Sequence, residues 1–522
     1  MRLLKATAQV GSFTLLSRIL GLVRDILLAR FLGAGVINDA LVTAMKLPNL
    51  FRRMFAEGAF NAAFVPLYAR RLEEDGQASA TRFASEALSA LLVLVAAIVL
   101  VFQITMPLSL NLVGFGLDRT SATGPAPYDL AVLYARVTMP YLLLMSLAAL
   151  ISGMLNTHSR FLAAAFAPVL LNMILIGVLL AAGAAQKGGQ GWSLPDLALY
   201  VSIGMTVSGI AQLALLIFAA RRAGLRIPLR RPRLTPGVRR LFVLGVPGII
   251  SAGITQINLM ASHTIATLQD SAASWLYYSD RLYQLPLGMI GIAMAVALLP
   301  ALSRQLRAGQ ATQAQHTQNR AMELSLLLTL PAAVALFTMP EFLIGGLFQR
   351  GEFTAFDTEQ AAKALRMFAL GLPAFVLLKV LTPAFFARED TRTPMLWAGV
   401  SAVVNVALGA TLFFTVGFFG LALATSVAAW TNVAGLSVLL LRSRTVIPDH
   451  RLLARLPRMA IASAAMGAAL WWAVPQVTLT GGMLHDYTRL LLLSAAGLAI
   501  YAASALALRA VRPSDLKASL AR

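Results

Sequence analysis

The sequence predicts an all-α polytopic membrane protein with fourteen transmembrane helices. Of its 522 residues, 58% are hydrophobic and only 12% are charged, whereas soluble domains carry about 25% charged residues. Apolar runs of about 20 residues, the length that spans a bilayer, recur from one end of the chain to the other. The polar stretches between them are short, so no separate soluble domain is expected.

Fourteen apolar segments are expected to form these helices. The first six lie at residues 8–32, 36–65, 83–113, 129–154, 160–184 and 195–221. The next six lie at residues 240–268, 273–302, 319–347, 359–386, 394–416 and 420–441. The last two lie at residues 456–474 and 488–510. Each segment is long enough to cross a bilayer, and polar or basic residues separate it from the next.

The distribution of lysine and arginine predicts the orientation in the membrane. If the N-terminus is cytoplasmic and the segments alternate, the inside loops and termini hold 28 of the 43 basic residues. The outside loops hold three, which are Arg119, Lys187 and Arg350. Cytoplasmic loops of membrane proteins are enriched in lysine and arginine. We therefore expect both termini to lie in the cytoplasm.

The net charge of +21 does not predict binding to nucleic acid. The basic residues lie in short loops between apolar runs, which is the pattern of membrane topology. The most basic loop, residues 221–240, contains prolines and is expected to rest on anionic lipid headgroups. The chain has no cysteine, which excludes disulfides and thiolate metal sites.

A faint internal repeat suggests two lobes. The second helix ends with Pro66 four residues before Arg70, and the eighth ends with Pro300 four residues before Arg304. Two six-helix repeats related by an axis along the membrane normal occur in several transporter folds, although chance explains a single such pair as readily. The resulting division is an N-terminal lobe (1–222), a basic cytoplasmic linker (223–239), a C-terminal lobe (240–442) and a C-terminal helix pair (443–522).

Two arginines interrupt the first helix. Arg18 and Arg24 lie six residues apart, which is about 9 Å along a helix, and they point roughly 120° apart. A charge at bilayer depth costs at least about 2.5–3.5 kcal/mol, so such residues usually face a water-filled cavity and mark a substrate path. Small residues (Gly11, Ser17 and Gly21) should let a neighbour come close to this helix. Asp25 could pair with Arg24, and structural ion pairs are the alternative explanation.

The second helix also carries several charges. Besides Asp39 near its start, it contains the string KLPNLFRRMFAEGAF at residues 46–60. Its proline, Pro48, is expected to break the helix, which is tolerable only beside protein or water. Arg53 and Glu57 are four residues apart and could pair on one face, which would leave Arg52 as the freer cation. The alternative is that both arginines extend to the membrane surface. Lys46 is a further cavity charge.

The eighth helix opens with the string SWLYYSDRLYQLP at residues 274–286. Its aromatic residues are typical of a membrane interface. Arg281 lies deeper than an interfacial belt requires and would face the first helices if the repeat is real. Asp280 could neutralise Arg281, which is the structural alternative.

Arginine binds phosphate through a planar fork of donors, so this set of charges favours a cavity for an anionic, phosphate-bearing substrate. Catalytic groupings are missing from the sequence. The five histidines show no metal-ligand spacing, and there is no glycine-rich phosphate loop. We therefore expect a non-enzymatic transporter with no cofactor and no metal. An integral-membrane glycan polymerase would need a larger outer loop with a catalytic acid, which the sequence does not offer.

Three stretches resemble the MurJ (MviN) family of lipid II flippases. They are residues 17–25 (SRILGLVRD), 46–60 (KLPNLFRRMFAEGAF) and 277–282 (YYSDRL). Residues 349–357 (QRGEFTAFD) also resemble an outer loop of that family. The likeness runs through all fourteen expected helices.

The resemblance implies the fold of the multidrug/oligosaccharidyl-lipid/polysaccharide exporter superfamily. In that fold two six-helix lobes surround a central cavity, and two C-terminal helices form a groove for a lipid tail. The resemblance further implies that the chain moves lipid II, the undecaprenyl-pyrophosphate-linked peptidoglycan precursor, to the outer leaflet of the bacterial inner membrane. Expected partners are lipid II and membrane lipids, with cell-wall synthesis proteins as further candidates and no nucleic acid.

The resemblance also implies roles for individual residues. The essential cavity arginines of the family correspond to Arg18, Arg24, Arg52 and Arg281, and further cavity or gate charges correspond to Asp39, Arg53 and Glu57. Some members bind sodium through acids in their seventh and eleventh helices. Here those helices contain no acid and offer only Asn258, His263 and Asn405, which puts sodium coupling in doubt.

Physical chemistry and the resemblance lead to one hypothesis. The four arginines neutralise a pyrophosphate, and the two lobes expose it to each side of the membrane in turn. Three alternatives remain. The substrate could be another polyprenyl-pyrophosphate-linked oligosaccharide, the chain could export drugs, or it could be a non-transporting scaffold for cell-wall assembly. A drug exporter usually relies on acidic cavity residues, whereas the charges here are basic.

Overall fold

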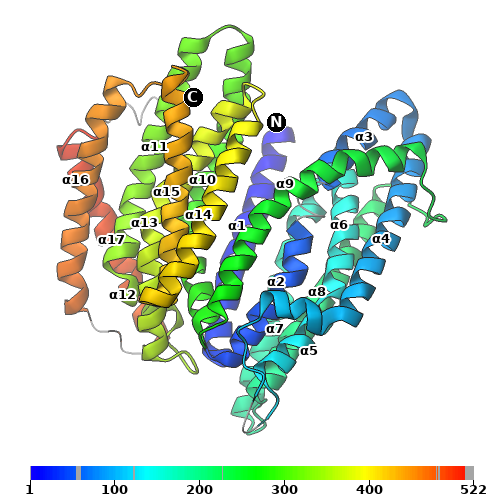
Figure 1. Ribbon diagram of the computed structural model, residues 1–522, viewed down its shortest axis with the longest axis horizontal. Coiled ribbons are helices and arrows are strands. Elements are labelled where there is room, and N and C mark those ends of the chain that lie inside the picture. The colour runs from blue at the N-terminus through cyan, green and yellow to red at the C-terminus, as the bar shows by residue number, and fades with distance from the viewer. Residues whose placement is uncertain are drawn as a thin grey trace. The chain divides into compact units, whose positions relative to one another are not determined.

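The computed structural model describes residues 2–53, 60–120, 124–225, 227–477, 479 and 482–511 (Figure 1), and these contain helices and no strand. In the first half of the chain the helices are α1 (Arg2–Leu32), α2 (Val36–Arg52), α3 (Phe60–Glu74), α4 (Gly76–Val113), α5 (Pro127–Thr138), α6 (Pro140–Thr157), α7 (Phe161–Lys187), α8 (Leu194–Arg222) and α9 (Pro236–Ala266). In the second half they are α10 (Ala272–Arg307), α11 (Ala311–Thr338), α12 (Pro340–Phe348), α13 (Ala355–Phe386), α14 (Arg392–Val416), α15 (Phe419–Arg442), α16 (His450–Ala473), η2 (Val474–Gln476) and α17 (Met483–Ala507).

The chain forms two compact units, Met1–Ser274 and Trp275–Arg522. In the first unit α1 packs against α7, α7 against α8, and α2 against α5, while α9 packs against α3 and α4. In the second unit α13 is central and packs against α11, α12 and α15. The C-terminal helices α16 and α17 pack against each other, and α16 lies along α11. The predicted division into two six-helix lobes, a linker and a helix pair stays a prediction.

The all-α class is confirmed. Nine helical spans in the described part of the chain are long and apolar enough to cross a membrane, with α5 and α6 counted as one span. This finding is consistent with the fourteen crossings expected. Two expected helices are divided in two within the described residues. The expected helix at 129–154 becomes α5 and α6, and that at 319–347 becomes α11 and α12. In both cases the second piece starts with a proline, Pro140 or Pro340, because proline lacks the amide that would continue the preceding turn.

In the helix expected at residues 36–65, the prediction for Pro48 was wrong. Pro48 was expected to break the helix, but α2 continues through it to Arg52. Proline removes one backbone hydrogen bond of the ladder. The neighbouring Asn49 adds a side-chain bond to the same turn, since its Nδ2 donates to the carbonyl of Met45 at 2.9 Å. Residues 54–59 lie outside the described part of the chain.

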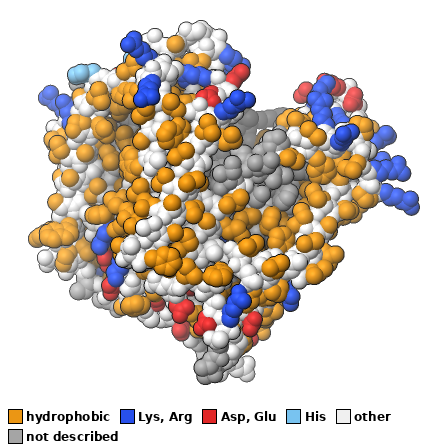
Figure 2. All heavy atoms as spheres, viewed as in Figure 1, with side chains coloured by type: hydrophobic (Ala, Val, Ile, Leu, Met, Phe, Trp, Pro, Cys, Tyr) orange, Lys and Arg blue, Asp and Glu red, His pale blue; other side chains and the backbone are white. Residues whose placement is uncertain are grey.

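The outer surface of the helices is apolar. Figure 2 shows hydrophobic side chains along the sides of the helices and lysine and arginine near helix ends. Large apolar side chains such as Leu112, Phe414 and Leu491 are 74%, 76% and 71% exposed. Soluble monomers rarely expose apolar patches of more than a few hundred Å², whereas a lipid-facing surface is expected to be apolar. The surface therefore agrees with a membrane environment.

Close packing inside the second unit depends on small residues. Gly435 of α15 lies against the Trp397 ring of α14, and a Cβ atom at Gly435 would come within 2.2 Å of ring carbons. Small residues at helix contacts let backbones approach closely in membranes, where the hydrophobic effect does not drive helices together. The α14–α15 hairpin therefore requires glycine at this position.

Replacing Gly435 with alanine is expected to destabilise the protein by about 1–3 kcal/mol, the usual cost of overpacking. The added methyl group would overlap the Trp397 ring. The matched control is Gly399→Ala on α14, where a Cβ atom meets open space and alanine is the better helix former. Thermal unfolding in detergent measures both variants. Equal melting temperatures would contradict this account of the hairpin.

Candidate functional site

Arg24 on α1 is held by two partners. Its Nε and Nη2 donate to Asp25 Oδ1 at 3.0 and 2.8 Å, and its Nη1 donates to Asn172 Oδ1 at 3.0 Å. The side chain of Arg24 is 18% exposed and that of Asp25 is 3% exposed. The predicted pairing of Asp25 with Arg24 is confirmed. The guanidinium is thereby fixed in one orientation at the contact between α1 and α7.

Asn172 on α7 is a polar residue that the sequence analysis missed. Its Nδ2 donates to the Ser17 carbonyl at 2.9 Å and approaches the Ser17 hydroxyl at 3.3 Å. One amide therefore connects the α1 backbone to α7 and also accepts from Arg24. A signal was present in the sequence, since Asn172 is an amide within an apolar segment, four residues after Pro168. Its value as a positioning residue follows only from the packing of α1 against α7.

Arg18 lies on the same helix as Arg24 and is half-buried. Between them, Gly21 faces Asn172, and a Cβ atom there would lie 3.8 Å from both polar atoms of its amide. This is an ordinary van der Waals distance, and a Cβ atom at Gly11 would meet open space, so the prediction that small residues admit a close neighbour stays a prediction. The substrate-binding role of Arg18 stays a prediction.

Asp39 is buried at the start of α2, with 2% of its surface exposed. Its Oδ1 accepts from the Ser274 amide at 2.8 Å and from the Ser274 hydroxyl at 2.5 Å. Ser274 lies in the first turn of α10 and belongs to the first unit. Asp39 therefore anchors the beginning of α10 on α2, which fits a gate or hinge charge better than a cavity charge.

Two further polar residues of α2 lie near α9. Thr43 Oγ1 and His263 Nε2 are 3.0 Å apart, and both side chains are buried. Lys46, less than one turn farther along α2, is half-buried and lies within electrostatic reach of His263. No local sequence pattern predicts the pairing of His263 with Thr43. Its contact with Thr43 joins two helices far apart in the chain.

Arg52 ends α2 and is half-buried, and its Nε lies 3.4 Å from the Asn49 side-chain oxygen. Arg53 follows and is exposed. Glu57, predicted to pair with Arg53, lies outside the described residues, so that pairing stays a prediction. At 3.4 Å the Arg52 hydrogen bond is long, and long hydrogen bonds are weak. Its guanidinium is therefore less constrained by this contact than that of Arg24 is by Asp25 and Asn172.

Arg281 and Asp280 lie in the second unit, on α10. The Arg281 guanidinium lies over the Tyr277 ring, 4.5 Å from its centroid, and Asp280 accepts from the Gln284 amide. The helix around them is firmly anchored. Trp275 Nε1 donates to Asp357 at 2.8 Å, and the Ser279 hydroxyl donates to the Ala361 carbonyl at 2.6 Å. Both hydrogen bonds attach α10 to α13, so the helix that carries Arg281 is held in place.

The arrangement suits electrostatic binding of an anion. Arginine offers several donors in one plane, and a partly buried guanidinium binds phosphate more strongly than an exposed one. Among the residues that the structure describes, no group of three or more His, Cys, Asp and Glu side chains could hold a metal ion. Within each unit taken by itself, the candidate groups for binding an anion therefore stay the partly buried arginines.

Comparison with known proteins assigns a family. A family model described as lipid II flippase MurJ matches residues 28–493. A relative from Rhizobium meliloti (strain 1021), named "Probable lipid II flippase MurJ", is 46% identical over 474 residues, which cover 91% of this chain and 87% of the relative. A relative from Burkholderia cenocepacia, named "Lipid II flippase MurJ", is 32% identical over 504 residues, which cover 95% of each chain.

Solved structures agree on the fold. A structure described as "Lipid II flippase MurJ, inward closed conformation" matches with a TM-score of 0.77 and 23% identity, over 98% of this chain and 99% of that one. An inward-facing multidrug resistance MATE family transporter of the MOP superfamily matches with a TM-score of 0.66 and 16% identity, over 82% of this chain and 94% of that one. At these identities the likeness concerns the fold alone.

The Asp39–Ser274 contact is expected to stabilise the first unit. Ser274→Ala should cost about 1 kcal/mol, because the backbone amide still donates. Asp39→Ala should cost about 2–3 kcal/mol, because both buried donors lose their acceptor. Thr120→Ala is a matched control. Thr120 donates its amide and hydroxyl to Asp118 in the same pattern, both at 2.9 Å, but in an exposed loop. Thermal unfolding should rank Asp39→Ala lowest, and a neutral Asp39→Ala would contradict the anchoring role.

Proposed function

This chain belongs to the lipid II flippase MurJ family, and we propose that it carries lipid II from the cytoplasmic to the outer leaflet of the bacterial inner membrane. It is a multi-pass membrane protein, and its family is one of transporters. The observation that carries the mechanistic part of the proposal is the half-buried Arg24, which Asp25 and Asn172 hold in one orientation.

The chemistry of the substrate explains why such arginines are needed. Lipid II combines a pyrophosphate, a sugar-peptide head and a polyprenyl tail. The tail is apolar and can remain in the lipid, whereas a doubly charged phosphate group cannot enter a medium of low dielectric constant without counter-charges. In this proposal Arg18, Arg24, Arg52 and Arg281 supply those counter-charges, and Lys46 and Arg53 add to the positive potential.

The partners of these cations limit how tightly the pyrophosphate is held. Asp25 already balances part of the charge on Arg24, so a bound phosphate shares the guanidinium with a carboxylate. If the site bound the pyrophosphate too tightly, lipid II would be released slowly at the outer leaflet. A transport site must both bind its substrate and release it. The acids proposed for the site therefore moderate the affinity for pyrophosphate or hold helix contacts that act as gates. These acids are Asp25, Asp39, Glu57 and Asp280.

Alternating access provides the movement. Two lobes, 1–222 and 240–442, would rock around the site and expose it first to the cytoplasm and then to the outside. The C-terminal pair, 443–522, would flank a groove for the lipid tail, and both termini would lie in the cytoplasm. The membrane potential favours return of an empty cationic site toward the cytoplasm by roughly 2.3 kcal/mol per charge per 100 mV. Sodium coupling has no support in the seventh and eleventh predicted helices, which lack acids.

The first test measures the accessibility of lipid II at the outer leaflet in cells depleted of their own flippase. Such cells are complemented by this chain or by Arg24→Ala, Arg24→Lys, Arg281→Ala or Arg281→Lys at equal expression. Loss of a buried charge partner costs about 2–5 kcal/mol, so both alanine variants should lose nearly all export. The lysine variants should recover part of it, since they keep the charge and lose the planar fork.

Surface arginines serve as matched controls for these variants. Arg70 pairs with Glu74, and Arg366 pairs with Glu341, in exposed ion pairs, so Arg70→Ala and Arg366→Ala should export normally. Full export by Arg24→Ala and Arg281→Ala would contradict the cationic site and favour a scaffold. No export by the unmodified chain would indicate a different polyprenyl-pyrophosphate-linked substrate.

The positioning role of Asn172 makes a separate prediction. Asn172→Ala leaves every arginine in place but removes the acceptor that orients Arg24. Export should fall about tenfold, which corresponds to the loss of one hydrogen bond to a charged group. The matched control is Asn111→Ala, because Asn111 also accepts from an arginine, Arg119, but in an exposed part of the first unit. Export by Asn172→Ala at the level of the control would contradict the positioning role.

A further inference from the structure

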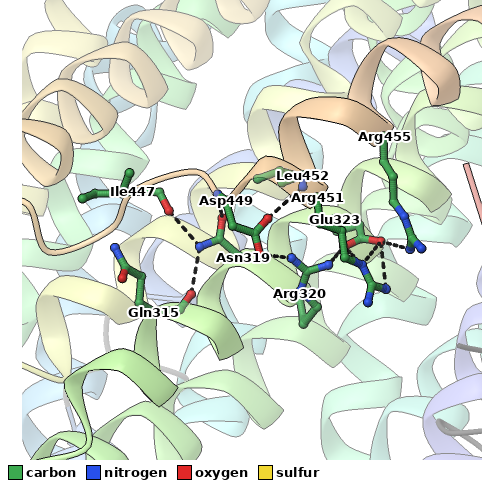
Figure 3. A network of polar contacts seen from close by, with 9 residues as sticks. All are labelled: Gln315, Asn319, Arg320, Glu323, Ile447, Asp449, Arg451, Leu452 and Arg455. Carbon is green, nitrogen blue, oxygen red and sulfur yellow. Dashed lines mark hydrogen bonds and ion pairs between the residues drawn. The ribbon is translucent and has the colours of Figure 1, made fainter.

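Glu323 of α11 is at the centre of a buried ionic network in the second unit (Figure 3). Three guanidinium groups reach its carboxylate. Arg455 Nη1 lies 2.5 Å from Glu323 Oε1, Arg451 Nε lies 3.2 Å from Oε2, and Arg320 is the third partner. Glu323 and Arg455 are each 6% exposed. Since Arg451 and Arg455 belong to α16, this network joins the first C-terminal helix to α11.

A second layer of the network fixes the segment before α16. Arg320 also pairs with Asp449, whose Oδ1 accepts from the Leu452 amide at 2.8 Å and so caps α16. Asn319 donates to the Ile447 carbonyl at 2.9 Å and accepts from the Asp449 amide at 3.1 Å. Burial raises the pKa of the Asp449 carboxyl, but its hydrogen bonds to Leu452 and Arg320 outweigh burial, and the pKa lies below 3.8. Asp449 therefore stays ionised at neutral pH.

The charges on α16 make Glu323 necessary. Arg451 and Arg455 lie in the first two turns of α16, where the helix dipole is positive and disfavours cations. Two acids, the buried Glu323 and the half-buried Asp449, offset this repulsion. Removing one partner of a buried ion pair is strongly destabilising, because the remaining charges are left uncompensated. The network is thus a specific attachment of α16 to α11.

A second ion pair attaches α17 at the opposite end of the helix pair. Arg350, which follows α12, lies 3.5 Å from Asp486 in the first turn of α17, and their side chains are 9% and 3% exposed. The Arg350 guanidinium also lies over the Tyr487 ring, 4.7 Å from its centroid. It donates to the carbonyls of Gly346 and Leu347, both at 3.0 Å. α17 is therefore held to the end of α12.

Contacts continue between the two ion-pair sites. The Tyr501 hydroxyl of α17 donates to the Leu327 carbonyl of α11 at 2.7 Å. A Cβ atom at Gly467 of α16 would lie 2.6 Å from Val334 Cγ1. The contacts thus follow α11 from Glu323 to Val334 and resume at the end of α12, so the attachment is distributed along the helix pair rather than confined to one end.

We propose that α16 and α17 form a fixed part of the second unit, locked to α11 and α12 by the Glu323 and Arg350 ion pairs and unchanged while access alternates. The inference rests on the proposed transport function and deepens it. The movement that exposes the site to each side must then occur at other helix contacts. A lipid tail lying against α16 or α17 stays with the second unit throughout transport.

An engineered disulfide tests this proposal directly, because the chain has no cysteine of its own. Val334→Cys combined with Gly467→Cys is the first pair, because a Cβ atom at Gly467 would lie 2.6 Å from Val334 Cγ1, and a disulfide needs neighbouring Cβ atoms about 3.5–4.5 Å apart. Cross-linking is measured as loss of maleimide labelling in native membranes. Gly346→Cys with Leu490→Cys is a second pair, between α12 and α17, because a Cβ atom at Gly346 would lie 2.2 Å from Leu490 Cδ1.

Each double variant is assayed for export of lipid II in its reduced and its oxidised form, with the single-cysteine variants as controls. We expect the disulfide to form to the same extent in energised and de-energised membranes, and oxidised protein to export as well as reduced protein. Loss of export on oxidation, restored by a reductant, would overturn the fixed attachment and leave the proposed function intact. Lack of export by the reduced forms and by the unmodified chain would contradict the proposed function. Even in that case, a disulfide that forms only in energised or only in de-energised membranes would overturn the fixed attachment.

Glu323→Gln provides a second measurement that does not depend on disulfide formation. Neutralising Glu323 leaves Arg320, Arg451 and Arg455 around an uncharged amide, so α16 should loosen from α11. In the reduced Gly467→Cys background, labelling of the single thiol by a membrane-permeable maleimide should rise several-fold. The matched control is Glu341→Gln, which removes the acid of an exposed pair with Arg366 and should leave labelling unchanged. Equal labelling in both variants would contradict the locking role of Glu323.

Discussion

A charge within a bilayer needs a partner, and this requirement shapes both units of the protein. Lipid supplies neither water nor counter-ions, so each buried guanidinium must find protein carboxylates, amides or ring faces. In the first unit Arg24 takes Asp25 and Asn172, and in the second unit Arg281 lies over Tyr277. Asp25 and Tyr277 lie on the same helix as the arginine they meet, whereas Asn172 lies on α7 and joins it to α1.

The same requirement has two different outcomes. At Glu323 three arginines surround a fully buried carboxylate, and the cluster binds helix to helix. At Arg24 one carboxylate and one amide leave the guanidinium partly exposed. The Glu323 cluster is an ionic attachment between two helices, α16 and α11. The Arg24–Asp25 pair lies within α1, and a neutral amide of α7 completes it, so this pairing orients a single guanidinium.

Close contacts between helices make these pairings possible. Gly435 receives the Trp397 ring, and Gly467 lets α16 approach α11. Without a hydrophobic driving force between helices in lipid, such contacts rely on packing and hydrogen bonds. Prolines have a complementary role, since Pro140 and Pro340 start new helices within single predicted segments. Pro48 does not, because α2 continues through it.

The sequence alone determined the fold class and indicated which charges are candidates for a site. Apolar runs of bilayer length predicted an all-helical membrane protein, and arginines within those runs identified Arg24 and its neighbour Asp25, because hydrophobicity and adjacent charges are local properties. Only the tertiary structure decided which distant residues complete the site. Asn172 meets Arg24 from 148 residues away, Ser274 meets Asp39 from 235 residues away, and Glu323 meets Arg455 from 132 residues away. No local pattern encodes these pairings, because each depends on how two helices pack face to face.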